Sequence, residues 1–255
     1  MCTARRCCWR RMSNIGIFPV PVITRREVVG AATFMRGLRL LFVSDVHLRK
    51  GVSRDRLEAL IDFIAAQRAD MLLLGGDYAE SPADCKRFFS ALSRVTCPLG
   101  GFGVPGNNDL MSADRLEEWM RLGHVRLLKN EFARLRLDGG TLEVGGCDDH
   151  RYGRPRTRHL FTGDERVYRI LLSHFPVAAD CACELQLSGH THGGQICLGR
   201  LSPYSIGFER RFGIRAVRGE AMIGHTRLMV CNGIGISRIP LRLGAPPEML
   251  LVEFV

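Results

Sequence analysis

The sequence contains no run of about 18 apolar residues, which is near the shortest stretch that crosses a bilayer as a helix. We therefore expect no membrane-spanning segment. Its 10 cysteines include no Cys-x-x-Cys pair of the zinc-binding type. A chain of 255 residues is too long for a scaffold held together by disulfides, so free thiols in a reducing cytoplasm are the simplest interpretation. Internal repeats and low-complexity linkers are also absent, which favours a single folded domain.

The composition is that of a soluble globular protein. Hydrophobic residues make up 46% and charged residues 24% of the chain, which excludes the disordered and fibrous classes. The net charge of +10 raises the possibility of a nucleic-acid partner. However, residues 1–34 contain six arginines against one glutamate, so half of the excess lies there, and the remainder is scattered. Nucleic acid is therefore an unlikely partner, and a smaller anionic ligand is the expected one.

The first part of the chain has a different character from the rest. We predict that residues 1–37 form a basic, poorly ordered tail and that residues 38–255 form the domain. Thr24–Ala32 contains the pair Arg25-Arg26 and faintly resembles a twin-arginine export signal. The apolar stretch is short and no small-residue cleavage site follows, so export is the less favoured alternative. A later start, at Met12 or Met35, is another alternative.

From Leu38 onward, strand-like and helix-like stretches alternate, which is typical of an α/β domain. The apolar runs Leu40–Val43 and Met71–Leu74 predict strands that are buried on both faces. Residues 53–68 carry apolar side chains at helical spacing, which predicts a helix.

Caps and short strands complete the expected pattern. Ser81-Pro82 is a favourable start for a second helix, a short strand should reach Val104, and Ser112 is a candidate cap for a third helix. The later part of the chain predicts short strands separated by glycine turns. They are Val125–Leu128, Phe132–Leu137, Thr141–Val144, Val167–Leu172, Leu185–Leu187, Leu228–Cys231 and Met249–Phe254.

Five short polar motifs each follow a predicted strand. They are Asp45-Val46-His47, Gly75-Gly76-Asp77, Gly106-Asn107-Asn108-Asp109, Ser173-His174 and Gly189-His190-Thr191-His192. Asp77 lies 32 residues after Asp45, and Asn107 lies 30 residues after Asp77, which is about one strand–helix–strand unit each. Because open α/β sheets bind ligands at the carboxyl ends of their strands, we expect these loops to converge.

The residue types in these motifs point to metal chemistry. Each motif alone is a weak signal, since glycine and asparagine favour turns and a lone histidine is more often a core residue. Five such motifs in this order are far less easily explained by chance. Carboxylate, amide and imidazole groups suit manganese, iron or zinc. Two such cations about 3.5–4 Å apart can share a hydroxide and bind the charged oxygens of a phosphate.

The ordered series D-x-H, G-D, G-N-x-D, H and G-H-x-H resembles that of the calcineurin-like metallophosphoesterase superfamily, across residues 38 to 255. The resemblance implies an α/β fold, a four-layer αββα sandwich of two mixed sheets flanked by helices. It also implies two divalent metal ions, with manganese, iron or zinc preferred. It assigns the first ion to Asp45, His47 and His192, the second to Asn107, His174 and His190, and the bridging position to Asp77.

A narrower resemblance concerns the stretches Gly189–Ile196 and Gly233–Glu248 and the segment Gly145–Asp149. They are similar to bacterial phosphodiesterases that are exported or held at a membrane, a branch related to UDP-2,3-diacylglucosamine pyrophosphatases. The resemblance implies a small-molecule or lipid-linked phosphate as substrate. It adds peripheral contact with the inner membrane as an alternative to the cytoplasmic location.

Asn108 departs from the family pattern, which usually has a histidine that protonates the leaving oxygen or stabilises the transition state. Asparagine donates a hydrogen bond but delivers no proton near neutral pH. We therefore expect substrates whose leaving group needs little protonation, such as phosphoanhydrides and activated aryl diesters. The histidines that could substitute are His124, His150, His159 and His225, each of which is more readily explained as structural.

These observations lead to a hypothesis for the reaction. A metal-bridging hydroxide attacks phosphorus and cleaves a phosphodiester or pyrophosphate bond, with Asp77 and Asn108 as catalytic residues and Asn107 contacting the substrate. Arg200, Arg210, Arg211 and Arg215 follow the last motif, and of these Arg200 and Arg211 are candidate phosphate contacts. The alternatives are a nuclease or a cyclic-nucleotide phosphodiesterase of the same fold. A non-catalytic scaffold is less favoured, because all seven ligand positions are filled.

Overall fold

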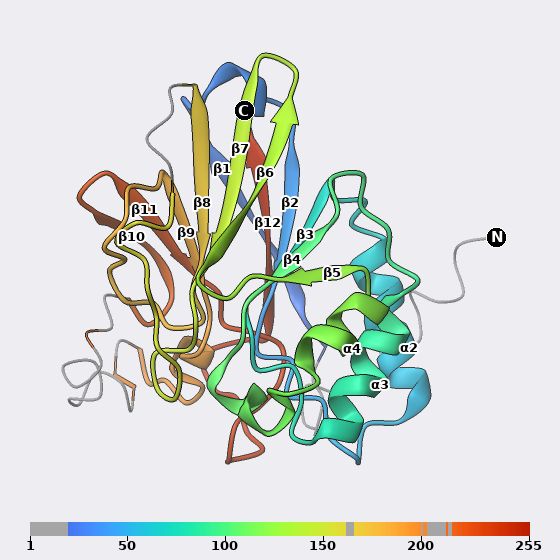
Figure 1. Cartoon of the computed structure of the whole chain (residues 1–255). Coiled ribbons are helices and arrows are strands. Elements are labelled where there is room, and N and C mark those ends of the chain that lie inside the picture. The colour runs from blue at the N-terminus through green and yellow to red at the C-terminus, as the bar shows by residue number, and fades with distance from the viewer. Residues whose placement is uncertain (1–19, 162–165, 200, 203–212, 214–215) are drawn as a thin grey trace.

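The computed structural model describes residues 20–161, 166–199, 201–202, 213 and 216–255. In this part of the chain, two six-stranded mixed sheets pack face to face (Figure 1). Helices lie outside the first sheet. The expected α/β class and the sandwich of two mixed sheets are confirmed. No helix in the described ranges combines the length and the apolar character needed to cross a membrane.

The first sheet has the strand order β1-β12-β2-β3-β4-β5. Its strands are β1 (Val22–Val28), β2 (Arg39–Val43), β3 (Met71–Leu74), β4 (Gly101–Gly103), β5 (Val125–Leu127) and β12 (Glu248–Phe254). Strands β2 to β5 are parallel to one another, and β12 is antiparallel to β2. The carboxyl ends of β2, β3 and β4 therefore lie at one edge of this sheet.

The second sheet has the order β10-β11-β9-β8-β7-β6. Its strands are β6 (Glu131–Leu137), β7 (Gly140–Gly146), β8 (Val167–Leu172), β9 (Leu185–Ser188), β10 (Gly219–Ile223) and β11 (Thr226–Val230). Strands β7, β8, β9 and β11 are parallel, and the two outer strands are antiparallel to their neighbours. Strand β10 is an edge strand with alternating exposed side chains, which explains why its sequence gave no clear strand signal.

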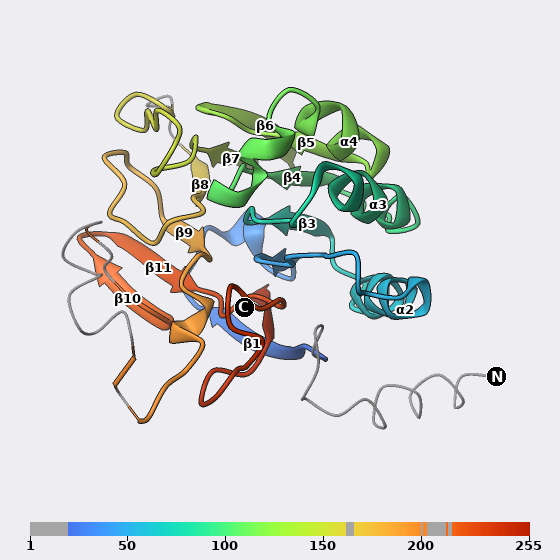
Figure 2. The ribbon, with the colours of Figure 1, turned by 90° about the horizontal axis from the view of Figure 1, so that it is seen from below.

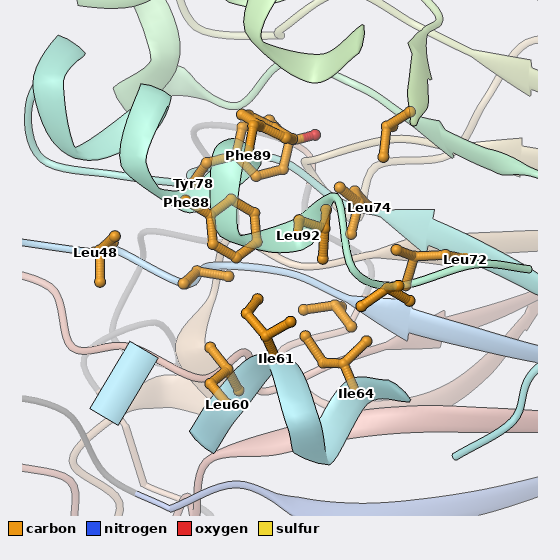
Figure 3. Close-up of a cluster of buried hydrophobic side chains, with 14 of the residues drawn as sticks. Leu48, Leu60, Ile61, Ile64, Leu72, Leu74, Tyr78, Phe88, Phe89 and Leu92 are labelled. Carbon is orange, nitrogen blue, oxygen red and sulfur yellow. The ribbon is translucent and has the colours of Figure 1, made fainter. Parts of the chain in front are cut away.

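The described α-helices all cover the outer face of the first sheet (Figure 2). They are α2 (Arg54–Ala65), α3 (Pro82–Leu92) and α4 (Leu116–Leu122). In Figure 3, Leu60, Ile61 and Ile64 of α2 lie below Phe88 and Leu92 of α3, and Leu72 and Leu74 of β3 lie on the side of Leu92. Because strand side chains alternate between faces, Leu41 and Val43 face these helices, while Leu40 and Phe42 face the second sheet.

Two helix starts were predicted from capping residues, and they have different outcomes. Ser81 caps α3, since its side chain accepts a hydrogen bond from the backbone N–H of Asp84. The prediction that Ser112 caps the next helix is wrong. Ser112 ends a 3₁₀ helix, η2 (Asn107–Ser112), and is buried, whereas α4 begins at Leu116 after Arg115. Two other 3₁₀ helices are η1 (Thr33–Met35) and η3 (His192–Gly194).

The outer face of the second sheet is covered differently from that of the first. On the outer face of the second sheet, the described residues contain no α-helix; instead loops cover it, with Leu160 and Phe161 packing near Leu171 of β8 and Cys183. The helices and these loops leave the carboxyl ends of the central strands open, at the lower ends of the sheets in Figure 1.

The predicted domain boundary at residue 38 needs correction. Residues 22–28 form β1, which pairs in parallel with β12 from Val22–Glu248 to Val28–Phe254. Val28 and Met35 are buried in the core between the sheets. The sequence of β1 contains Thr24-Arg25-Arg26-Glu27 and so looks polar, because most of its side chains at the sheet edge are partly exposed. The domain therefore includes β1 and η1.

Candidate metal centre

Loops from both sheets meet at the lower edge of the sandwich. Asp45 and His47 follow β2, Asp77 follows β3, and Asn107 begins η2 after β4. From the second sheet, His174 follows β8, and His190 and His192 follow β9. The structure thus brings all seven predicted ligand positions to one edge, as their spacing along the chain indicated.

The backbone at this edge is strained. Eleven residues other than glycine have a positive φ in the described part of the chain, and five of them are predicted ligands: Asp45, His47, Asp77, His190 and His192. Such a conformation costs on the order of 1–3 kcal/mol per residue and persists where the surroundings impose it. This concentration of strain is typical of a functional site.

Two glycines are needed for the loops to approach one another. A Cβ on Gly189 would collide with Asp45 and with the neighbouring Ser44. Gly76 has a φ of +90°, and a Cβ there would lie 2.6 Å from the backbone nitrogen of Gly106. The glycines of these motifs therefore permit close contact between loops, beyond their usual role in turns.

A first cluster of possible ligand atoms comes from Asp45, His47 and His192. One atom of each lies within 4.8 Å of the others, and all three side chains are buried. The Nε2 atoms of His47 and His192 face each other at 3.0 Å, and His192 Nε2 lies 3.5 Å from Asp45 Oδ1. Two imidazoles and a carboxylate around one point suit a divalent transition metal.

A second cluster comes from Asp45, Asp77 and His174, with the same spacing limit of 4.8 Å and the same burial. His190 joins it through its Nδ1, which lies 3.3 Å from His174 Nε2. The two oxygens of Asp77 face different clusters. Oδ2 is 3.5 Å from His47 Nε2, and Oδ1 is 3.5 Å from His174 Nε2.

Outer partners orient the imidazole rings. His47 Nδ1 lies 2.6 Å from a carboxylate oxygen of Glu80, and His174 Nδ1 lies 2.7 Å from the carbonyl oxygen of Gly75. Since both partners accept, each Nδ1 donates its proton outward and each Nε2 faces the cluster. This arrangement, in which the second ring nitrogen donates to an oxygen, is the usual one for a metal-binding histidine.

The protonation states of the predicted ligands also suit a bound cation. Burial lowers the pKa of His190 and His192 well below the usual value, helped by His174 and by His47 respectively, so both rings are neutral. Burial opposes ionisation of Asp77, but His174 and His47 hold its pKa well below the usual range. Burial likewise opposes a charge on His174, yet Asp77 and Asp45 raise its pKa to about 10, so a metal that binds there would displace a proton.

The residues present fit a metal in two further respects. Within the described ranges, the ion pairs of the buried carboxylates Asp45 and Asp77 are with histidines and not with lysine or arginine. The side-chain oxygen of Asn107 is buried and has no hydrogen-bond partner among the described groups. Buried polar atoms normally have partners, so this oxygen is a plausible metal ligand.

Asp109 organises the loops without belonging to either cluster. Its Oδ2 accepts hydrogen bonds of 2.8 Å from the backbone N–H groups of Asp77 and Gly106, and its Oδ1 accepts one of 3.0 Å from Tyr78. Burial and the nearby Asp77 raise the pKa of Asp109 to about 7. The sequence placed Asp109 within a motif but did not indicate that it joins two loops.

A cleft of about 640 Å³ opens beside the clusters. Its wall includes the predicted residues His47, Asp77, Asn107, Asn108, His190 and His192. It also includes Gln195, Ser237, Arg238 and Ile239, which belong to the two stretches of the narrower resemblance. The sequence did not single out the remaining residues, which are Arg49, Glu80, Arg151, Tyr152 and Phe175. No local motif marks these five, because they reach the cleft from separate loops.

Two earlier expectations about the cleft have different outcomes. Arg200 and Arg211, the candidate phosphate contacts, lie outside the described residues. Of the histidines considered as substitutes for the general acid, His150 is half-buried near Phe175 and His124 lies at a separate depression beside β5. None of His124, His150, His159 and His225 lines the described wall of the cleft.

Comparison with known proteins agrees with this geometry. The family model for calcineurin-like phosphoesterases matches residues 38–194, a range that includes all seven predicted ligand positions. The chain belongs to this family. A phosphoesterase of this family is a hydrolase that acts on phosphoric ester bonds, and the clusters of carboxylates and imidazoles suit divalent metal.

Three bacterial proteins are similar to this phosphoesterase. It is 31% identical to YpbG of Bacillus subtilis over 227 residues, which cover 84% of this chain and 80% of that protein. It is 30% identical to the metallophosphoesterase YkuE of the same organism, with 84% and 77% covered. It is 27% identical to the phosphodiesterase YaeI of Escherichia coli, with 85% and 82% covered.

Proposed function

We propose that this protein is a dinuclear metal-dependent phosphohydrolase that cleaves a phosphodiester or pyrophosphate bond. The observation that carries the proposal is the pair of buried clusters, which share Asp45 and are spanned by the two oxygens of Asp77. A carboxylate with one oxygen toward each cluster supports the bridging role that the family resemblance assigns to Asp77. A single-ion site would have no use for the second cluster.

Asp45, His47 and His192 would hold one ion, and Asn107, His174 and His190 the other. Manganese, iron and zinc are the proposed metals, because four of the ligands are imidazoles. The chemistry that two bound divalent ions supply is a hydroxide nucleophile from water near neutral pH and neutralisation of charge on the phosphate oxygens. Glu80 and Gly75 keep the rings of His47 and His174 in the required orientation.

The cleft wall supports an anionic substrate with more than one charged group. Arg49, Arg151 and Arg238 line the cleft beside the clusters. Guanidinium groups bind phosphate oxygens through paired hydrogen bonds, so they suit a second phosphate or a diester. We extend the substrate class to a small-molecule or lipid-linked phosphate. The relative YaeI is named a phosphodiesterase, which supports a diester as the bond that is cleaved.

Asn108 shapes the choice of leaving group. Its backbone N–H donates a hydrogen bond of 2.7 Å to Asp77 Oδ1, and its side-chain amide lies in the cleft wall. From this place an amide can donate a hydrogen bond to a leaving oxygen but cannot give it a proton. We therefore expect hydrolysis of anhydrides and aryl diesters, and slow hydrolysis of alkyl esters.

Metal analysis and a substrate panel test the proposal. Purified protein supplied with manganese should contain two ions per chain and hydrolyse an aryl phosphodiester. Asp77→Asn should lower the metal content and reduce turnover by roughly 10³-fold or more, since it removes the proposed bridging charge. One ion per chain in the active enzyme would contradict the dinuclear centre, and turnover of the aryl monoester alone would contradict the preference for diesters.

Asn108→His tests the proposed absence of a general acid. A histidine at this position should raise turnover of an alkyl diester by roughly 10-fold or more while changing turnover of an aryl diester little, because general acid catalysis typically contributes about 10²–10⁴-fold. The measurement is kcat for the two diesters in both proteins. Equal changes for the two substrates would show that Asn108 does not limit protonation of the leaving group.

The cytoplasmic location also stays a prediction.

A further inference from the structure

Exposed apolar side chains gather beside the mouth of the cleft. Of the 13 large apolar residues that are exposed in the described part of the chain, five belong to two short segments, 198–201 and 239–243. We call these five the apolar rim: Leu198, Leu201, Ile239, Leu241 and Leu243, with exposed fractions between 48% and 71%. Single exposed apolar residues are common on a protein surface, but a contiguous group usually marks a binding surface.

The two segments of the apolar rim are held together by backbone pairing. Leu243 accepts a hydrogen bond of 2.7 Å from Cys197 N–H and donates one of 2.8 Å to the carbonyl oxygen of Gln195. The side-chain amide of Gln195 also donates to the carbonyl oxygens of Ser237 and Ile239, at 2.9 and 2.8 Å. The leucines and the isoleucine are therefore presented from fixed backbone positions.

The apolar rim adjoins the cleft. Ile239 lines the cleft itself, beside Arg238, and Gln195 contributes to the same wall. The loop between β11 and β12, drawn in red, projects beyond the lower ends of the sheets in Figure 1. A surface that contacts the apolar rim would therefore lie against the entrance to the candidate metal centre.

Charge around the apolar rim indicates the kind of partner. Arg238 is exposed beside Ile239, and by sequence residues 195–202 and 237–244 contain no aspartate or glutamate. Arg218 adds an exposed guanidinium, which donates to the carbonyl oxygens of Gly199 and Gly244. Apolar side chains surrounded by basic ones suit a surface that is negatively charged outside and apolar beneath, as an anionic bilayer is. A second copy of this chain would bring like charges together.

We propose that the apolar rim docks on the surface of an anionic lipid bilayer, so that the cleft opens toward the headgroup layer. Leu198, Leu201, Leu241 and Leu243 would enter the boundary between headgroups and acyl chains, while Arg218 and Arg238 contact lipid phosphates. The consequence that a headgroup or lipid-linked phosphate is the substrate rests on the proposed function. The docking itself does not.

Vesicle sedimentation tests the docking. The full chain should sediment with vesicles of equal parts phosphatidylcholine and phosphatidylglycerol, and bind much less to phosphatidylcholine alone. Leu198→Ser/Leu241→Ser should weaken binding to the anionic vesicles by about 10-fold or more, since each change removes an apolar side chain from the contact. Neither residue lines the cleft. An unchanged melting temperature will show that the variant is folded.

A matched variant distinguishes vesicle binding through the apolar rim from nonspecific adsorption of exposed apolar side chains and from binding through the basic residues before β1. Val29→Ser/Met222→Ser removes two equally exposed apolar side chains, after β1 and on β10, and should bind vesicles as the wild type does. The proposal would be overturned if Leu198→Ser/Leu241→Ser bound anionic vesicles as well as the wild type does. It would also be overturned if the wild type bound no anionic vesicles. If light scattering showed the wild type to be a dimer and Leu198→Ser/Leu241→Ser to be a monomer, the apolar rim would be a dimer interface and the proposal would be overturned. Hydrolysis of a soluble aryl diester, measured without vesicles, reports on the proposed function separately.

Discussion

At the scale of single residues, Arg242 has the most hydrogen bonds near the candidate metal centre. Its guanidinium is largely buried and donates to carbonyl oxygens of Asn232, Gly233, Gly235, Ala245 and His192. It also lies 3.2 Å from the His192 ring. Burial lowers the pKa of Arg242 to about 10, which still leaves it charged at neutral pH. A buried charge with this many acceptors connects the loop after β11 to a predicted metal ligand.

We predict that Arg242→Met lowers the free energy of unfolding by about 3–5 kcal/mol, because it leaves several buried carbonyl oxygens without a donor. It should also weaken metal uptake by about 10- to 100-fold, since His192 loses a partner that orients it. Chemical denaturation and metal titration measure the two effects.

The control for this substitution is Arg54→Met. The Arg54 side chain is 88% exposed and pairs only across the helix surface with Glu58. Its removal should change the free energy of unfolding by no more than about 0.5 kcal/mol. Similar losses in the two variants would mean that the hydrogen bonds of Arg242 contribute little.

At the scale of elements, β1 shows how a strand can depend on a distant partner. It pairs with β12 along its whole length, and Thr24 donates a side-chain hydrogen bond to Glu248. Arg25 pairs with Glu253 on the neighbouring strand at 2.9 Å. Arg25 and Arg26, the pair that made this segment resemble an export signal, thus lie along a sheet edge, where charged side chains also discourage pairing with another molecule.

We predict that a chain starting at Met35 is less stable by several kcal/mol than a chain starting at Met12. The shorter chain lacks β1, and the buried side chain of Val28 alone contributes about 1.5–3 kcal/mol. It also exposes the backbone of β12 as a new sheet edge, so it should aggregate more readily. Thermal unfolding and light scattering compare the two chains. Equal melting temperatures would show that β1 adds nothing to the domain.

At the scale of the whole molecule, the candidate metal centre joins the two sheets. Asp45, Asp77 and Asn107 come from the first sheet, whereas His174 and His192 come from the second. Metal bound between them would add a connection between the sheets at this edge. Two buried carboxylates without a metal would repel each other, and both burial and Asp77 raise the pKa of Asp45.

We predict that removing metal with a chelator lowers the melting temperature by several degrees. A ligand present at about 100 times its Kd stabilises the folded state by about 2.7 kcal/mol, and each kcal/mol corresponds to roughly 2–4 °C for a chain of this size. Differential scanning calorimetry measures the change. Asp77→Asn is the control and should show no shift with metal. Melting that is the same with and without chelator in the wild type would argue against a metal that holds the sheets together.

Local signals account for the parts of the fold that the sequence predicted. The strand Met71–Leu74 agrees with its prediction residue for residue, because an apolar run between turns is a local pattern. Ser81 was recognised as a cap because its N–H partner, on Asp84, is three residues away. The prediction for Ser112 was wrong because it used the same local signal. Ser112 has the residue type of a cap, but it is buried by tertiary packing and the helix begins later, at Leu116.

The sequence by itself determined the family and the positions that converge, because the motif spacing and the strand ends are properties of the chain alone. Only the tertiary structure decided which groups surround those positions. Glu80 beside His47, Gln195 against Ile239 and Arg242 beside His192 are contacts between loops from different strands. No local pattern encodes such contacts, since they form only when both sheets have packed and their loops share one edge.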